Sequence, residues 1–173
     1  MYLKLIGSII VVFSSGLMGI TIASKFANRP LELRKTRLIF QMLETEVIYG
    51  ATPLPAAFQN ISHKSDELWS KFFLSVNQKL VSGSYYSLTD AWNKSLDEII
   101  SESYLIKMDI ELLKNFGIVL GCSDRDDQQK HFKLLYAQMQ QHEEIAEQER
   151  KKNERMYRSL GFLFGIFIFI ILI

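Results

Sequence analysis

Two long stretches without a charged residue lie at opposite ends of this 173-residue chain. Leu5–Ser24 has 20 uncharged residues and Ser159–Ile173 has 15, whereas the segment between them carries 19 basic and 19 acidic residues. Twenty helical residues span about 30 Å, the thickness of a bilayer core. The pattern predicts an N-terminal transmembrane anchor over 1–25, a soluble domain over 26–155 and a C-terminal transmembrane helix over 156–173.

Each apolar end has a competing interpretation. A cleaved signal peptide would use Lys4 as its basic start and Thr21-Ile22-Ala23 as its cleavage site, but the apolar run exceeds the usual signal-peptide core. The second stretch covers only about 22 Å as a helix, so a span there begins at Met156 and lets Arg158 reach the headgroups. A hydrophobic tail docked on a partner protein is the alternative for this segment.

Basic residues flank both stretches on the side of the central segment. They are Lys25, Arg29, Arg34, Lys35 and Arg37 after the first stretch, and Arg150, Lys151, Lys152, Arg155 and Arg158 before the second. The positive-inside rule then predicts a cytoplasmic central domain with both chain ends on the other side of the membrane. The same charges would also attract anionic lipid.

Small residues recur at helical spacing within both apolar stretches. Ser15, Gly19 and Ala23 are four residues apart, and Gly161 and Gly165 form a GxxxG motif. Because such residues let helix backbones approach closely in lipid, we expect these five positions to pack membrane helices together. The helices would pair with each other or with helices of a partner.

The central segment has apolar residues at three-to-four spacing and no alternation typical of strands. Residues that favour helix starts mark the expected elements: Pro30, Thr52-Pro53, Ser65, Ser87 and Ser123. The first of these helices would end near Tyr49, and Ser82-Gly83-Ser84 would end the third. A further helix that carries Ile106 to Leu120 would end at Gly121. The prediction is an all-α antiparallel bundle of five or six helices flanked by the transmembrane helices. Its core would hold Phe40, Trp69, Phe72, Phe73, Trp92 and Phe116.

The residues offer little for catalysis or metal binding. A single cysteine, Cys122, excludes an internal disulfide, and no histidine base is identified for it. Asp127 and His131 are one helical turn apart, yet two ligands do not make a metal site. Glu44 and Glu46 project from different sides of their helix. We therefore predict no enzyme activity, cofactor or metal, and the net charge of +1 gives no sign of nucleic-acid binding.

Three groups of residues resemble a known family. The first comprises Arg29-Pro30-Leu31-Glu32-Leu33-Arg34 and Leu43-Glu44-Thr45-Glu46-Val47-Ile48-Tyr49-Gly50-Ala51-Thr52-Pro53-Leu54. The second comprises Phe116-Gly117, Leu120-Gly121, Asp124 and Gln128-Gln129-Lys130, and the third Lys152-Asn153-Glu154 and Ser159-Leu160-Gly161-Phe162-Leu163. Together they resemble the stage III sporulation protein AB family along essentially the whole chain.

The resemblance implies a membrane protein of endospore-forming bacteria, located in the mother cell at the outer forespore membrane. The family belongs to a multi-protein channel between mother cell and forespore, and its soluble domain is similar to the cytoplasmic domains of type II secretion system protein F, an inner-membrane platform. The implied partners are the secretion-type ATPase stage III sporulation protein AA and other stage III channel proteins. Self-association stays open.

We expect the ATPase to contact the acidic turn Asp124, Arg125, Asp126 and Asp127, because charged turns suit specific contacts. Helix capping and solubility are the competing explanation for the same residues. The alternative function is an anionic-lipid surface adaptor, or a structural membrane scaffold without ATPase contact.

Overall fold

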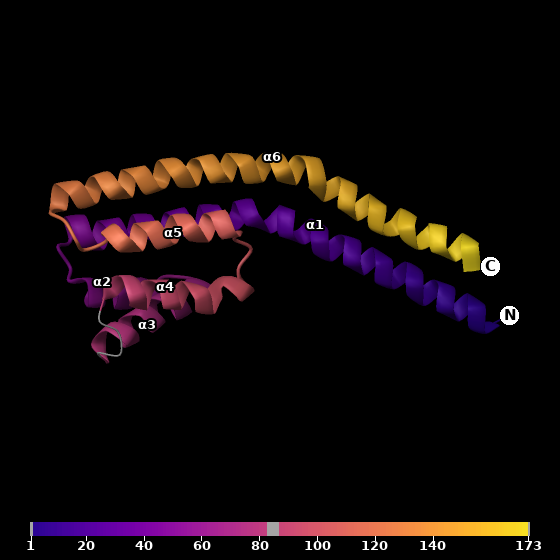
Figure 1. Cartoon of the computed structure of the whole chain (residues 1–173), viewed down its shortest axis with the longest axis horizontal. Coiled ribbons are helices and arrows are strands. Elements are labelled where there is room, and N and C mark those ends of the chain that lie inside the picture. Colours follow the sequence, from indigo (N-terminus) through magenta and orange to yellow (C-terminus); the bar gives the residue numbers. More distant parts are fainter. Residues whose placement is uncertain (1, 83–86, 173) are drawn as a thin grey trace. The chain divides into compact units, whose positions relative to one another are not determined.

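The computed structural model describes residues 2–82 and 87–172, and within these ranges every regular element is helical (Figure 1). The helices are α1 (Tyr2–Glu44), α2 (Leu54–Ser62), α3 (Glu67–Val81), α4 (Leu88–Ile99), α5 (Lys107–Val119) and α6 (Arg125–Leu172). A π-helix, η1 (Thr45–Tyr49), continues α1, and a short 3-10 helix, η2 (Ile100–Glu102), follows α4. The predicted all-α bundle is confirmed. Ser82 caps the end of α3 as expected, whereas Gly83 and Ser84 lie outside the described residues.

The chain divides into two compact units. The first unit contains the residues up to 31 and those from 143 onward, and the second contains Glu32–His142. Helices α1 and α6 contribute to both units. Within the described part of the chain, no helix combines the length and the apolar character that a membrane span requires. The two transmembrane helices and the boundaries expected for them stay predictions.

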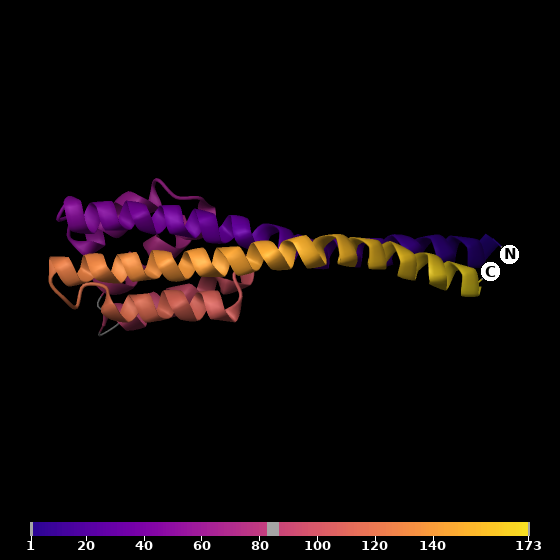
Figure 2. The same ribbon diagram turned by 90° about the horizontal axis from the view of Figure 1, so that it is seen from above.

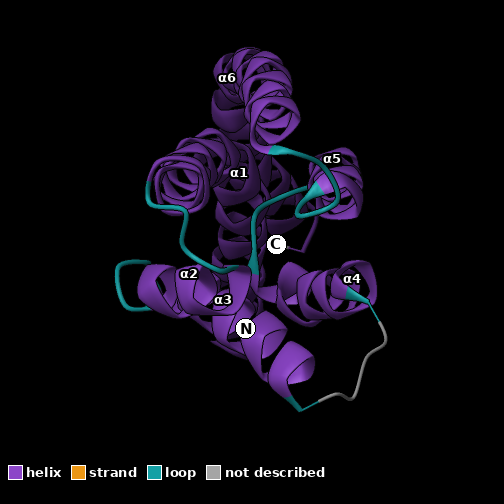
Figure 3. Cartoon of the chain, turned by 90° about the vertical axis from the view of Figure 1, so that its left-hand side faces the viewer, coloured by secondary structure: helices purple, strands orange, loops and turns teal. Residues whose placement is uncertain are grey.

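The second unit is layered. Helix α6 lies above α1 and α5 and between the two, as the two perpendicular views show (Figures 2 and 3). Helices α1 and α5 in turn lie on α2, α3 and α4 (Figure 3). Helices α1 and α6 run in opposite directions, so the end of η1 and the first turn of α6 lie at the same end of this unit (Figure 1).

Aromatic side chains form the core of the second unit. Trp92 on α4 is fully buried, with its ring centroid 4.8 Å from that of Phe72 and 5.9 Å from that of Phe40. Its indole N–H donates to the Leu113 carbonyl on α5 at 2.9 Å, so the polar atom of the buried ring has a partner. All six predicted core aromatics are buried, and Phe58 and Phe132 join them. Each such side chain stabilises the fold by about 1.5–3 kcal/mol through burial.

Pro30 was expected in the first turn of a helix, and this prediction is wrong. It lies inside α1, which continues from Tyr2 without a break. A proline in a helix interior removes one backbone hydrogen bond and disfavours the preceding turn. Its neighbours offset that cost, because Arg29 and Leu33 are both almost fully buried. Packing on both sides of the proline overrides its local preference to begin a helix.

The cap of α3 also differs from the prediction. Asp66, in extended conformation, accepts the Trp69 backbone N–H at 3.3 Å and caps the helix. Ser65, the expected cap, donates its hydroxyl to the Ile61 carbonyl one turn back on α2. Serine and aspartate are both good helix caps. Because the Ser65 hydroxyl is bound to the end of α2, Asp66 caps α3 instead.

The start of α4 agrees with the prediction, whereas the start of α6 is shifted by one residue. Ser87 accepts the Asp90 backbone N–H at 3.1 Å, and its hydroxyl donates to the Asp90 carboxylate at 2.7 Å. At α6 the cap is Asp124, which accepts the Asp127 N–H at 2.9 Å. Ser123 lies one residue too early, and its carbonyl accepts the Gln128 side-chain amide instead.

Gly117 on α5 leaves the space that the Trp92 indole occupies, since a Cβ at this position would overlap the ring. We expect Gly117→Ala to lower the free energy of unfolding by about 1–3 kcal/mol through overpacking. The better helix propensity of alanine, about 1 kcal/mol, would reduce this loss without cancelling it. Denaturant unfolding followed by tryptophan fluorescence measures the change. Asn115→Ala, on the exposed face of α5, is the matched control and should differ little from wild type.

Candidate partner-binding surface

The π-helix at the end of α1 begins the candidate surface. Its wide turn is closed by backbone bonds from Gly50 N–H to the Thr45 carbonyl at 2.9 Å and from Thr52 N–H to the Glu46 carbonyl at 3.0 Å. Ala51, just after it, has a φ of 49°, an uncommon conformation for a residue with a Cβ. Single π-turns within α-helices are rare and frequent at functional sites.

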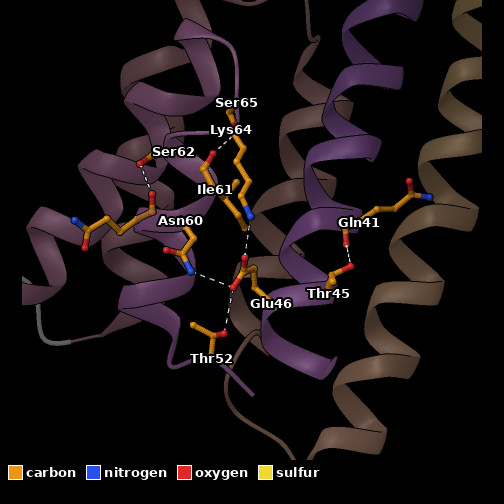
Figure 4. Close-up of polar contacts among 10 residues, drawn as sticks. Gln41, Thr45, Glu46, Thr52, Asn60, Ile61, Ser62, Lys64 and Ser65 are labelled. Carbon is orange, nitrogen blue, oxygen red and sulfur yellow. Dashed lines mark hydrogen bonds and ion pairs between the residues drawn. The ribbon is translucent and has the colours of Figure 1, made fainter. Parts of the chain in front are cut away.

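The Glu46 carboxylate connects this turn to α2 (Figure 4). It accepts hydrogen bonds from the side chains of Thr52 at 3.1 Å, Asn60 at 3.1 Å and Lys64 at 3.2 Å. The bonds from Asn60 and then Lys64 hold the pKa of Glu46 below its ordinary value. Thr52 was expected to cap α2, but Pro53 occupies that position and the Thr52 hydroxyl serves Glu46.

Tyr49 and the start of α6 complete the surface. The Tyr49 side chain is 64% exposed, and its hydroxyl accepts the Gln129 amide N–H at 3.1 Å. Gly121, with a φ of +77°, turns the chain before α6, and a Cβ there would come within 2.8 Å of Leu54 at the start of α2. The turns that follow α1 and α5 therefore meet at one end of the second unit.

The four residues of the predicted acidic turn have different surroundings. Asp124 caps α6, and Asp127 forms an ion pair with Lys130 at 2.7 Å, which lowers the pKa of Asp127. Arg125 and Asp126 are exposed. Two of the four residues thus stabilise the helix start, and two project into solvent. We call the set Glu46, Tyr49, Asp124, Arg125, Asp126, Asp127 and Gln129 the η1–α6 surface.

Four of the five predicted packing residues of the terminal helices can be placed in the first unit. The Ser15 hydroxyl donates to the Gly161 carbonyl at 2.6 Å, and a Cβ on Gly19 would lie 2.9 Å from the Gly161 Cα. Ala23 is buried. Gly165 belongs to α6, but its surroundings lie outside what the structure describes. The structure therefore brings Ser15, Gly19 and Gly161 into direct contact.

Further contacts hold the two helices of the first unit together. The rings of Phe26 and Tyr157 stack with centroids 5.5 Å apart. Arg29, only 4% exposed, forms an ion pair with Glu149 at 2.7 Å. Because a buried guanidinium is costly without its carboxylate, this pair fixes which turns of α1 and α6 face each other.

A second polar cluster links α3 and α4, and sequence reasoning missed it. Lys79 Nζ contacts the hydroxyl of Ser75 and the Glu98 carboxylate, the latter at 2.8 Å. Ser95 donates to Ser75 at 3.1 Å. The bonds from Lys79 and then Ser75 lower the pKa of Glu98. The cluster therefore joins α3 to α4 through an ion pair and hydroxyl contacts.

Two carboxylates in the second unit are buried. Asp109 is 1% exposed, accepts the Ile106 backbone N–H at 3.0 Å and contacts His142 Nδ1 at 2.8 Å. Burial, and then the nearby charge of Asp66, raise the pKa of Glu32. From the sequence, the role of Asp109 could be inferred only from its i,i+3 spacing to Ile106, which is typical of a helix start. Its contact with His142 depends on the fold.

The remaining candidates for chemistry have other contacts. Cys122 is exposed, and its thiol faces the Ile118 carbonyl at 3.2 Å. Asp127 pairs with Lys130, whereas His131 lines a groove of about 310 Å³ between α5 and α6. Among the described residues, no three potential metal ligands come together.

These features define a class: a small all-helical protein whose first and last helices contribute to two compact units, and in which η1 and the start of α6 form a polar surface. A family model for stage III sporulation protein AB matches residues 4–173. The chain belongs to the stage III sporulation protein AB family. Stage III sporulation protein AB of Bacillus subtilis (strain 168) is 38% identical over 170 residues, which cover 98% of this chain and 99% of the relative. A solved structure of a stage III sporulation protein AB, also 38% identical, superposes with a TM-score of 0.66 over 72% of this chain and 98% of the solved chain.

Glu46→Gln should lower the melting temperature at neutral pH, because the amide cannot replace the ion pair with Lys64. The pKa of Glu46 is lower in the folded chain than in the unfolded chain. The ionised carboxylate therefore stabilises the fold at a pH above the unfolded-state pKa, and this stabilisation is lost as the pH falls through the folded-state pKa. The difference between variant and wild type should therefore shrink as pH falls below 4.5, the ordinary value. Thermal unfolding between pH 3 and 7 measures it.

Glu111→Gln is the control for this experiment, because Glu111 pairs with Lys107 of the same helix, at 3.7 Å, and with no other described residue. A melting temperature that differs between wild type and Glu46→Gln by the same amount at every pH would contradict the assigned role of the carboxylate.

Proposed function

We propose that this chain is a membrane-anchored, non-enzymatic platform component of the channel between mother cell and forespore. In this proposal the η1–α6 surface docks a cytoplasmic secretion-type ATPase, stage III sporulation protein AA. Other stage III channel proteins contact the rest of the chain's surface. The terminal apolar stretches anchor the chain in the outer forespore membrane, with the second unit in the mother-cell cytoplasm.

The position of the η1–α6 surface is the observation that carries the docking proposal. It lies about 26 Å, measured along α1 and α6, from the end of the second unit where the chain continues to the apolar stretches. A surface at the far end of the bundle is accessible to a partner that approaches from the cytoplasm. Part of the first resembling motif, Glu46 and Tyr49 included, lies in this surface and not in the core.

The chemistry of the surface also suits protein binding. Tyr49 offers a large exposed ring whose hydroxyl is already oriented by Gln129, so little side-chain entropy is lost on binding. Arg125 and Asp126 supply exposed charges of both signs beside it. Such a mixture of one aromatic anchor and surrounding charge favours a specific contact over nonspecific adhesion.

The orientation of the second unit can be tested with the chain's own cysteine, the only one in the sequence. Cys122 is exposed beside the η1–α6 surface. In membrane vesicles from sporulating cells, a membrane-impermeant maleimide should label it only when the cytoplasmic face is outward. The Cys122→Ser chain gives the background. Labelling only from the opposite face would exclude contact with a cytoplasmic ATPase and would reopen the cleaved-signal interpretation.

The docking surface is tested by the double variant Tyr49→Ala, Asp126→Lys in the full chain. We expect the affinity for the ATPase to fall roughly tenfold or more, as for loss of an interface anchor. Capture of purified ATPase by the detergent-solubilised chain measures it. Asp124 and Asp127 are left intact, because changing them would also weaken the start of α6.

Glu111→Lys, a charge reversal on the outer face of α5, is the matched control and should bind like wild type. Binding by the double variant that equals wild type would assign the ATPase contact to another surface. Failure of the wild-type chain to capture the ATPase would favour the alternative, a lipid adaptor or a scaffold without ATPase contact.

A further inference from the structure

A groove with a basic lining follows one face of α6 in the first unit. Its volume is about 530 Å³, and it is lined by Arg150, Lys151, Glu154, Arg155 and Arg158. The spacing of these residues, alternately one and three positions, places them on successive turns of the same helix face. Four cations and a single carboxylate give the groove a strongly positive field.

The carboxylate pairs with two of the four cations that line the groove. Glu154 lies 3.8 Å from Arg150 and 3.3 Å from Arg158, and Arg150 also meets Glu147 at 3.4 Å. Lys151 and Arg155 are exposed, and neither forms an ion pair with another described residue. These two cations are therefore available for an anion from outside the chain.

Their helical register adds a third cation. Lys151, Arg155 and Arg158 are spaced four and three residues apart, so they lie one above another on adjacent turns. A guanidinium presents a planar fork that matches two oxygens of a phosphate, and an ammonium adds a mobile point charge. The three side chains together fit a phosphate group better than a single surface lysine does.

The position of the groove in the sequence decides the source of the phosphate. Arg158 is the last charged residue of the chain, and the uncharged stretch Ser159–Ile173 follows it directly. If this stretch enters the bilayer, as the proposed function requires, Arg155 and Arg158 lie at the depth of the lipid headgroups. Basic groups at that depth attract anionic lipids.

We propose that this groove binds the phosphate of an anionic phospholipid. Lys151 and Arg155 hold the phosphate oxygens, and Arg158 contacts the phosphate from the next turn while its guanidinium keeps its pair with Glu154. Glu154 also pairs with Arg150, which lies farther from the phosphate along the groove. The basic flank is then a lipid site with defined residues, in addition to any role in setting the orientation of the chain.

The test uses the full chain in nonionic detergent micelles. Short-chain phosphatidylglycerol and phosphatidylcholine with identical acyl chains are titrated separately, and the apparent affinity is read from the shift in melting temperature. Wild type should bind phosphatidylglycerol more tightly. Lys151→Gln combined with Arg155→Gln should weaken that binding roughly 30-fold, since each cation near an anionic surface contributes about fivefold.

The matched control is Lys107→Gln combined with Lys133→Gln, which removes two exposed cations from the second unit and should leave the lipid affinity unchanged. Equal affinity for the two lipids, or an equal loss in both double variants, overturns the proposal. Competition by millimolar inorganic phosphate that abolishes the preference would identify an anion site without lipid selectivity and also overturns it. Because the titration is made in micelles, its result is independent of the maleimide experiment, so failure of the lipid site and failure of the proposed topology are distinguishable.

Discussion

The second unit depends on how α4 and α5 share the space around one indole ring. Trp92 of α4 fills the volume that Gly117 of α5 leaves empty. The indole N–H donates to the carbonyl of Leu113, which lies one turn before Gly117 on α5. This contact places α5 against α4 in a single register. Phe116, the neighbour of Gly117, then contacts both Phe40 of α1 and Phe132 of α6, with centroids 5.5 and 4.9 Å apart. Within the second unit, α1 and α6 are therefore positioned through the neighbour of the glycine that this ring covers.

Polar side chains secure the edges of this aromatic core. Tyr136 of α6 donates its hydroxyl to the Glu44 carboxylate of α1 at 2.9 Å, and burial raises the pKa of the phenol well above its ordinary value. The cluster around Lys79 joins α3 to α4, and Asp109 joins the start of α5 to His142. These bonds between α1 and α6, α3 and α4, and α5 and α6 add direction to the apolar packing, which specifies a unique arrangement more strongly than apolar contact alone.

Much of the fold follows from local rules, and the exceptions have identifiable causes. Apolar spacing located the helices and their buried aromatics, and Ser87 and Gly121 marked a start and an end correctly. Pro30 misled because its neighbours are buried by contacts that no local rule contains. The Glu46 carboxylate in the π-turn has its partners Asn60 and Lys64 14 and 18 residues later, which is beyond the reach of local rules. Of the predicted acidic turn, sequence reasoning could not separate the two residues that stabilise α6 from the two that project into solvent, because both kinds satisfy the same pattern.

The pairing of α1 with α6 in the first unit has a consequence for the order of folding. Arg29 and Glu149 are 120 residues apart, and Ser15 and Gly161 are 146 apart. At ribosomal rates of about 5–20 residues per second, Glu149 is made roughly 6–24 s after Arg29. Folding of the second unit can begin within that interval. The helix pair of the first unit can form only after the interval, when Glu149 has been synthesised. This pair is consequently the last part of the chain to form during synthesis.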